Sequence, residues 1–337
     1  MRATIIEWAA EQPWSDGTVV TFGTSYYGIT QPQVAARQPQ ALKGFFTIEM
    51  CTDYFRHIVM LGGTPQAAFL SLWMGGNFTD SQEKLQVPPV LRAALSHVFN
   101  SRLKALWWPQ LQKRLAQIQT GFMKKPPTRA YKELFANLVL DGKTRETNDM
   151  PPGPYQEMDK IQAPFVVVQN PGHLNLHQFG AYDLFENAAT PDGRKWLIIG
   201  PAEYDLPCMH WQLEALAFFD HILHGAENGY AQQPPVRDLT DGTDEYHGAT
   251  AFPIPGSDRV HLHPTVDPAH RQTLTTEPGE AAGVNSWGAA PIGAPVTPQF
   301  ADVTNQTVTY ELPIEELTEF SGPVTATLRF SCNEIDS

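Results

Sequence analysis

The chain has 337 residues, of which 42% are hydrophobic and 18% are charged, so it is long and apolar enough to bury a sizeable core. Its formal net charge of -13 disfavours binding to nucleic acids and anionic membranes, which attract proteins largely through Lys and Arg. Cys51, Cys208 and Cys332 show no metal-ligand spacing, which argues against a disulfide framework or a structural zinc site. We therefore expect a globular protein with no metal, no cofactor, no nucleic-acid partner and no membrane partner.

The two ends of the sequence bear on the cellular location of the protein and on whether the chain is truncated. The N-terminus lacks the charged-then-apolar pattern of a signal peptide, and no apolar run reaches the roughly 20 residues that span a bilayer. This pattern predicts a cytoplasmic location. The chain begins inside an amphipathic helix at residues 4–11 and stops within a predicted strand pair, so we expect it to be truncated at both ends.

The first elements alternate between strand and helix. Residues 18–22 form a short apolar run typical of a strand, residues 30–36 are typical of a helix, and residues 41–47 predict a second buried strand. The same rhythm resumes later, with strands at 165–169 and 195–199 and helices at 178–187 and 213–224. Such alternation indicates a parallel α/β sheet. We assign residues 1–50 and 156–232 to this sheet domain.

Two further regions differ from the sheet domain in composition. Residues 51–155 show helical patterns without a strand pattern, in particular at 89–100, 101–120 and 129–137, and predict an inserted helical cap. After Pro234 the sequence turns to Pro, Gly, Thr and short alternating runs. This second change predicts an incomplete β jelly roll over residues 233–337, with a domain boundary near residue 233.

One serine lies where a nucleophile could be placed. Ser25 follows the first predicted strand and is bracketed by Gly23 and Gly28, in the spacing G-x-S-x-x-G. A serine at a sharp strand-to-helix turn has its hydroxyl raised above the sheet, and the N–H of the next residue, here Tyr26, can point at an oxyanion. The alternative interpretation of this short pattern is a glycine-rich turn with an ordinary surface serine.

A longer stretch around Ser25 resembles a known family. Residues 7–31 resemble the nucleophile region of the X-Pro dipeptidyl-peptidases and cocaine-esterase-like (CocE/NonD) hydrolases, in which Q-P-W-x-(D/N)-G precedes G-x-S-Y-x-G. Further matches follow in the same order along almost the whole chain, at residues 62–63, 176–177, 195–197, 218–223, 228–229, 234–237, 252–256 and 318–323.

The resemblance implies both a fold and a chemistry. Members of the family have an α/β-hydrolase sheet, a helical cap and a C-terminal jelly roll, and they hydrolyse esters or amides through a Ser, Asp, His triad. By this resemblance Ser25 is the nucleophile and the backbone N–H of Tyr26 is an oxyanion donor. The implied substrate is a small-molecule carboxylic ester or an X-Pro-type peptide.

The other two members of the triad are replaced at their expected positions. His173 stands where the family has its acid, and Tyr204 stands where the family has its histidine. His210, or His173 itself, is a candidate for a relocated base, because a triad needs a base within hydrogen-bond reach of the serine. The candidate acids are Asp205 and Glu203, while His177 is interpreted as a polar residue at a helix start.

The short segment before Ser25 has its own consequences. Only 24 residues precede it, so the family's earlier strands and its upstream oxyanion tyrosine are not found here. An uncovered parallel edge favours association, so an oligomer formed through this edge is possible. Two hypotheses follow: a serine hydrolase acting through an acyl-Ser25 intermediate, or a catalytically inactive relative or gene fragment.

Overall fold

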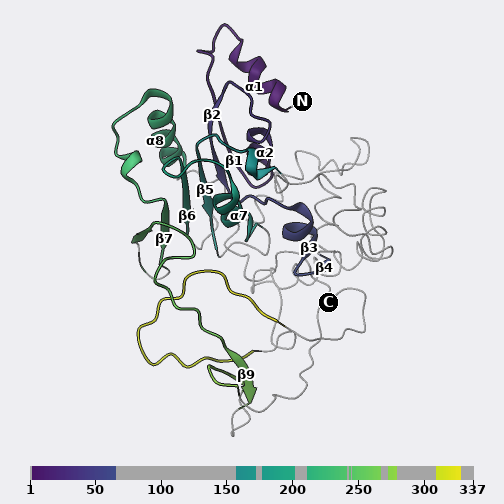
Figure 1. The fold of residues 1–337 in the computed structure, drawn as a ribbon, viewed down its shortest axis with the longest axis vertical. Helices are drawn as coiled ribbons and strands as arrows, with labels where there is room; N and C mark the ends of the chain where they lie inside the picture. The colour runs from purple at the N-terminus through teal and green to yellow at the C-terminus, as the bar shows by residue number, and fades with distance from the viewer. Residues whose placement is uncertain are drawn as a thin grey trace, which may run out of the picture. The chain divides into compact units, whose positions relative to one another are not determined.

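The structure, a computed structural model, describes residues 2–65, 157–171, 177–201, 211–240, 243, 245–266, 272–278 and 309–327. The chain divides into two compact units. The first unit comprises Met1–Ile58, Met150–Val260 and Ile314–Leu328, and the second comprises Val59–Asp149, His261–Pro313 and Arg329–Ser337. The first unit contains the sheet around which the candidate site is built (Figure 1).

The first unit is built on a six-stranded sheet in the order β1-β2-β5-β6-β7-β8. Neighbouring strands from β1 to β7 are parallel, and β8 pairs antiparallel with β7. This mixed sheet confirms the α/β part of the predicted fold class. The strands are β1 (Val19–Thr24), β2 (Leu42–Ile48), β5 (Phe165–Gln169), β6 (Lys195–Ile199), β7 (Val236–Leu239) and β8 (Tyr246–Ala249).

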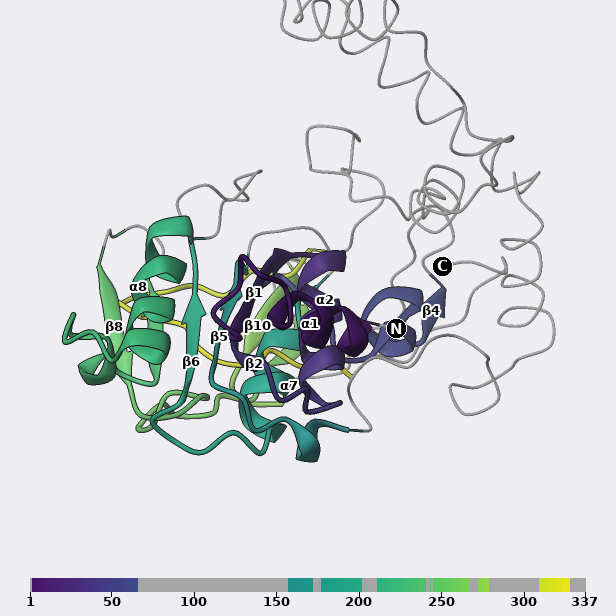
Figure 2. The same ribbon diagram turned by 90° about the horizontal axis from the view of Figure 1, so that it is seen from above.

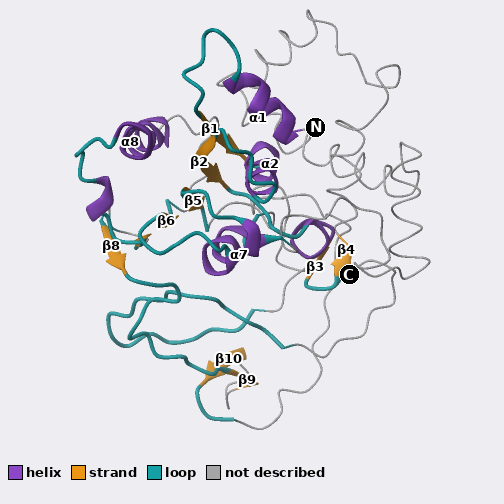
Figure 3. Cartoon of the chain, turned by 45° about the horizontal axis from the view of Figure 1, so that its top comes forward, coloured by secondary structure: helices purple, strands orange, loops and turns teal. Residues whose placement is uncertain are grey.

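Helices cover both faces of this sheet. α2 (Tyr26–Ala35) and α7 (Gly180–Asn187) lie on one side of the strands, and α8 (Trp211–His224) lies on the other, as Figures 1 and 3 show. α1 (Arg2–Ala10) precedes β1. β2 and β5 are buried along nearly their whole lengths, because helices on both faces exclude water from them.

An apolar core joins α8 to one face of the sheet. Alternate residues of neighbouring strands, such as Phe46, Val168 and Ile198, point to this face because side chains alternate along a strand. Phe218 of α8 is fully buried against them, and its ring meets Trp196 edge-on at a centroid distance of 5.8 Å. This core fixes the strands whose carboxyl ends carry the candidate site.

The sheet extends beyond the domain boundary predicted near residue 233. β7 hydrogen-bonds to β6, and β8 continues the sheet to Ala249. The composition change at Pro234 therefore falls between β6 and β7, within the first unit. Val236 is buried, but the other residues of β7 are partly exposed, so the apolar pattern of β7 is weak in the sequence.

In the part of the second unit that the structure describes, there are two short antiparallel strand pairs. β3 (Met60–Leu61) pairs with β4 (Thr64–Pro65), so residues 51–155 contain strands where only helices were expected. β9 (His263–Val266) pairs with β10 (Gln272–Thr275), and a bridge joins Thr273 to Glu311. The predicted helices at 89–100, 101–120 and 129–137 lie outside the described residues, and the jelly roll stays a prediction.

Figure 2 shows the strands and helices of the first unit from above. None of the helices in the described ranges is both long enough and apolar enough to cross a bilayer.

Candidate active site

Ser25 occupies a strained turn between β1 and α2. Its backbone has φ 58° and ψ -121°, a conformation that non-glycine residues rarely adopt. Two hydrogen bonds hold the turn: the Ser25 N–H donates to the carbonyl of Ile48 at 2.9 Å, and the Ser25 carbonyl accepts from Ile29 at 2.8 Å. Strain of this kind persists only where the surrounding structure enforces it. The turn matches the strand-to-helix elbow expected around Ser25.

The two glycines around Ser25 are required by close packing. A Cβ atom on Gly28 would lie 2.8 Å from Thr47 Oγ1 and 2.9 Å from the Ile48 carbonyl oxygen. A Cβ atom on Gly23 would lie 2.6 Å from the side-chain amide nitrogen of Gln31. Gly28 therefore lets α2 approach β2 closely, which gives the G-x-S-x-x-G spacing a physical reason.

His177 is the histidine that the structure brings to Ser25. The Ser25 Oγ atom lies 3.1 Å from His177 Nε2, across 152 residues of sequence. His177 is 6% exposed and has φ 65°, so its side chain is held in a buried and unusual backbone conformation. A neutral imidazole with its proton on Nδ1 can accept the hydroxyl proton at Nε2. The pair can therefore move a proton from serine to histidine.

The pairing of Ser25 with His177 was not predicted from the sequence. His177 was interpreted as a polar residue at a helix start, whereas the structure places it in a bend before α7, which begins at Gly180. The available signal was topological: β1 and β5 belong to one sheet, so the loops after their carboxyl ends meet at the same edge. His177 was also part of the family match at residues 176–177.

Glu49 is a buried carboxyl group at the same edge. It follows β2 directly, and its N–H donates to the carbonyl of Val168 at 2.9 Å. The residue is 0% exposed, and burial raises the pKa of its carboxyl group from 4.5 to about 8. Glu49 was not singled out from the sequence, where it reads as an ordinary residue after a strand.

Unusual backbone conformations are concentrated here. Four non-glycine residues in the described part of the chain have positive φ, namely Ser25, Gln38, Glu49 and His177. Three of them, all except Gln38, belong to the loops at the carboxyl edge of β1, β2 and β5. Strained residues cluster at active sites and ligand clamps, so this arrangement marks the edge as the candidate site.

The backbone N–H of Tyr26 has the position expected of an oxyanion donor. Tyr26 is the first residue of α2, directly after Ser25. Amides in the first turn of a helix have no acceptor within that helix and lie at the positive end of its dipole. This location can stabilise negative charge beside Ser25.

The remaining candidates from the sequence lie outside the described residues. These are His173, Glu203, Asp205 and His210. Within the ranges that the structure describes, no group of three or more His, Cys, Asp and Glu side chains is placed to hold a metal ion.

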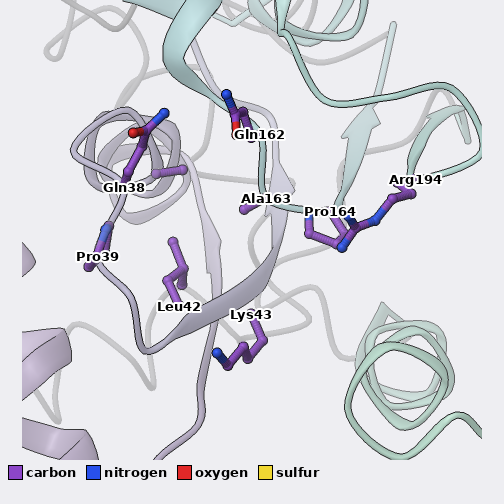
Figure 4. Close-up of a pocket in the computed structure, with 9 residues that line it drawn as sticks. Gln38, Pro39, Leu42, Lys43, Gln162, Ala163, Pro164 and Arg194 are labelled. Atoms are coloured by element: carbon purple, nitrogen blue, oxygen red, sulfur yellow. The ribbon is translucent and has the colours of Figure 1, made fainter.

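A surface pocket of about 280 Å³ lies at the opposite edge of the sheet (Figure 4). Its lining includes Leu42 and Lys43 at the start of β2, and Pro164 and Arg194 immediately before β5 and β6. Ser25 and Glu49 lie at the carboxyl ends of the strands instead. The pocket is therefore separate from the Ser25–His177 pair.

Comparison with protein families gives a match to X-Pro dipeptidyl-peptidase (S15 family) over residues 2–204. Among curated proteins, the chain is 22% identical over 300 residues to "Putative serine esterase Mb1866c" of Mycobacterium bovis, covering 76% of this chain and 45% of that protein. It matches "Putative serine esterase MT1883" of Mycobacterium tuberculosis with the same identity and coverage. The chain thus spans less than half the length of the curated relatives it matches.

Among solved structures, the chain is similar to a CocE/NonD family hydrolase from Staphylococcus aureus. The two are 23% identical with a TM-score of 0.53, and the match covers 82% of this chain and 41% of that one. This similarity supports the α/β fold.

Proposed function

Because this chain belongs to the X-Pro dipeptidyl-peptidase (S15) family of serine hydrolases, we propose that Ser25 is its nucleophile and His177 its general base. The observation that carries the proposal is the 3.1 Å separation between Ser25 Oγ and His177 Nε2. This distance is within the range in which a base can take a proton from a nucleophile. The reaction would be hydrolysis of a carboxylic ester or an X-Pro-type amide.

The proton path follows from the geometry. His177 Nε2 accepts the Ser25 hydroxyl proton while Oγ forms a bond to the substrate carbonyl carbon. The resulting imidazolium then gives this proton to the leaving alcohol or amine as the bond to the leaving group breaks. A water molecule repeats the sequence, which releases the acid and regenerates Ser25.

The oxyanion of each tetrahedral intermediate would form beside the Tyr26 N–H. The dipole of α2 adds to the attraction, because its N-terminus carries partial positive charge. Each such donor typically contributes on the order of 100- to 1000-fold in rate. Tyr26 thus has its role through its backbone, and its side chain is not needed for this step.

The domain organisation is proposed on the same basis. A helical cap over residues 51–155 would shape the substrate pocket, and a jelly roll would occupy the C-terminal region. Of the residues suggested by the sequence, Asp205 and Glu203 remain candidates for the orienting acid, and His173 and His210 remain candidates for the base. His177 is preferred as base because its Nε2 atom lies 3.1 Å from Ser25 Oγ.

A catalytically inactive relative is the second candidate. It is favoured by the replacement of the family's acid by His173 and of its histidine by Tyr204. Under this alternative the strained turn survives from descent and Ser25 is not activated. The two candidates differ in whether Ser25 forms a covalent acyl intermediate.

The test uses one ester and one amide. The purified chain is mixed with p-nitrophenyl acetate and, separately, with alanyl-proline p-nitroanilide, and the released product is followed together with the protein mass. We expect an acetyl group on Ser25 and turnover that Ser25→Ala abolishes. Ser15→Ala is the matched control, since Ser15 lies in the turn before β1 and its Oγ accepts a bond from the Gly17 N–H at 3.2 Å.

Turnover of the amide would support the peptidase reaction, and turnover of the ester alone would support an esterase. A folded chain that hydrolyses neither compound and acquires no acetyl group would overturn the hydrolase proposal and leave the inactive relative.

A further inference from the structure

The carboxyl edge of the sheet places Glu49 beside the Ser25 turn. Thr24 of β1 is in register with Ile48 of β2, so Ser25 and Glu49 are the next residues of two neighbouring strands. Adjacent strands lie about 4.8 Å apart, which sets the scale of the separation between these two backbones. The Ser25 N–H bonds to Ile48, directly before Glu49.

Backbone hydrogen bonds also connect the carboxyl ends of β2, β5 and β6. Glu49 N–H donates to Val168 of β5, and Gly200 N–H donates to Gln169 at 2.7 Å. The loop that carries His177 begins after Gln169, so Glu49 lies between the strand that delivers Ser25 and the strand that delivers His177. These backbone hydrogen bonds fix the position of the Glu49 backbone at the end of β2.

The segment after Glu49 is packed tightly against the start of α7. A Cβ atom on Gly180 would lie 2.2 Å from the carbonyl oxygen of Met50 and 2.4 Å from Cα of Cys51. The Thr52 hydroxyl also donates to the Asp183 carboxylate. Since His177 lies three residues before the start of α7, the same contacts help to hold both Glu49 and His177 in place.

Burying a carboxyl group costs free energy, and an apolar side chain at the same position would avoid this cost. Both carboxyl oxygens of Glu49 and the Nδ1 atom of His177 are shielded from water. A carboxyl group that is neutral in this environment becomes favourable in its ionised form when a positive charge develops next to it. His177 acquires such a charge when it takes the Ser25 proton.

We propose that Glu49 is the positioning residue of the Ser25–His177 pair and that its carboxylate stabilises the His177 imidazolium during acylation. This inference rests on the proposed function and names an acid directly after β2, whereas the acids expected from the sequence, Glu203 and Asp205, follow β6. Ionisation of Glu49, whose pKa burial raises to about 8, then increases the reactivity of Ser25 as pH rises.

Other titratable groups belong to the elements packed around this edge, and comparison with Glu49→Gln separates the titration of Glu49 from theirs. They are Tyr26 of α2, Cys51, Asp53 and His57 of the segment after β2, and Asp183 of α7.

The first experiment reads His177 directly. The wild-type chain is labelled with ¹⁵N-histidine, and its ring resonances, assigned with His177→Gln, are followed from pH 5 to pH 10. We expect the His177 signals to shift in two steps, the upper one near pH 8, and to lose the upper step in Glu49→Gln. A single step in the wild type would overturn the inference, and this wild-type readout does not require catalysis.

The second experiment measures the rate at which a fluorophosphonate modifies Ser25 as a function of pH. The wild-type rate should rise through pH 8, and the Glu49→Gln rate at pH 9 should be lower by roughly 10-fold or more. Glu157→Gln is the matched control, because Glu157 is a partly exposed carboxylate paired with Arg37 and Lys160. Equal pH profiles for wild type and Glu49→Gln would contradict the positioning role.

The two experiments separate the failure of this inference from the failure of the proposed function. An unreactive Ser25 with an intact upper step at His177 would overturn the hydrolase proposal while leaving the coupling between Glu49 and His177 supported. A reactive Ser25 without an upper step at His177 would support the hydrolase proposal and overturn the coupling between Glu49 and His177.

Discussion

The Oγ atom of Ser25 lies 3.1 Å from the Nε2 atom of His177, although the two residues are 152 positions apart in the sequence. The sheet produces this proximity, because β1 and β5 both flank β2 and end at the same edge. The turn at Ser25 and the bend at His177 are both held in positive-φ conformations. Their geometry is thus set by the backbone before any substrate is present.

Removal of the His177 imidazole should disable proton transfer. We expect His177→Ala to lower kcat/KM for p-nitrophenyl acetate by about 100- to 10,000-fold, the usual contribution of a general base. His247→Ala is the control, because His247 is an exposed residue of β8. Steady-state kinetics of both variants check the prediction, and equal losses in the two would argue against His177 as the base.

Gly28→Ala should destabilise the fold. The added methyl group would lie 2.9 Å from the Ile48 backbone oxygen, which cannot move without disturbing β2. We expect the free energy of unfolding to fall by about 1–3 kcal/mol, as in other overpacked sites. Urea denaturation measures the change.

Tyr27→Ala is the control for Gly28→Ala, since Tyr27 is the preceding residue of α2 and is 73% exposed. Its effect should stay within about 0.5 kcal/mol. A Gly28→Ala variant as stable as Tyr27→Ala would contradict the close approach of α2 to β2.

The Glu49 carboxyl group should make stability depend on pH. Its pKa is raised from 4.5 to about 8 in the folded chain, so between these values the folded state holds a proton that the unfolded state has released. The free energy of unfolding should therefore decrease as pH rises from 4.5 to 8, by on the order of 4 kcal/mol. Denaturation at several pH values should show this slope in the wild type and lose it in Glu49→Gln.

Glu157 should have the opposite effect on the pH dependence of stability. A hydrogen bond from Lys160, together with Arg37, lowers the pKa of Glu157, so this group contributes stability that is lost as pH falls through its lowered pKa. Glu157→Gln should change the acid side of the stability profile and leave the slope between pH 4.5 and pH 8 intact. A wild-type profile that rises over that interval would contradict the burial of a neutral Glu49.

The α8 core should respond to truncation of its central ring. Phe218 is fully buried between α8 and the sheet, and Phe218→Ala should cost about 3–5 kcal/mol. Leu213→Ala on the same helix, where Leu213 is 76% exposed, should cost less than about 0.5 kcal/mol. Chemical denaturation of the two variants compares them, and similar losses would mean that α8 does not pack as described.

Much of the sheet domain could be predicted from the sequence because its signals are local. The strands β5 and β6 have the predicted bounds, since their apolar runs are bordered by polar and turn-forming residues. α2 begins at Tyr26, four residues before the expected start, because the chain passes directly from the Ser25 turn into helix. The strand β7 was missed because Arg237 and Asp238 interrupt its apolar pattern.

The candidate site was only partly predictable, because it depends on contacts between distant loops. Ser25 and Gly28 belong to one short motif and could be identified together. His177 and Glu49 lie at the site because of the order of the strands in the sheet, and this order cannot be deduced from a single sequence. The predicted bases were His173, which follows β5, and His210, which follows β6, whereas His177 was not predicted although it also follows β5.

The most direct measurement is fluorophosphonate labelling of the wild-type chain, with the modified peptide identified by mass spectrometry and compared with Ser25→Ala. The activated Ser25–His177 pair predicts one phosphonate per chain, located on Ser25 and absent from the variant. A folded chain that remains unlabelled, or that is labelled equally after Ser25→Ala, would contradict the assignment of Ser25 as an activated nucleophile.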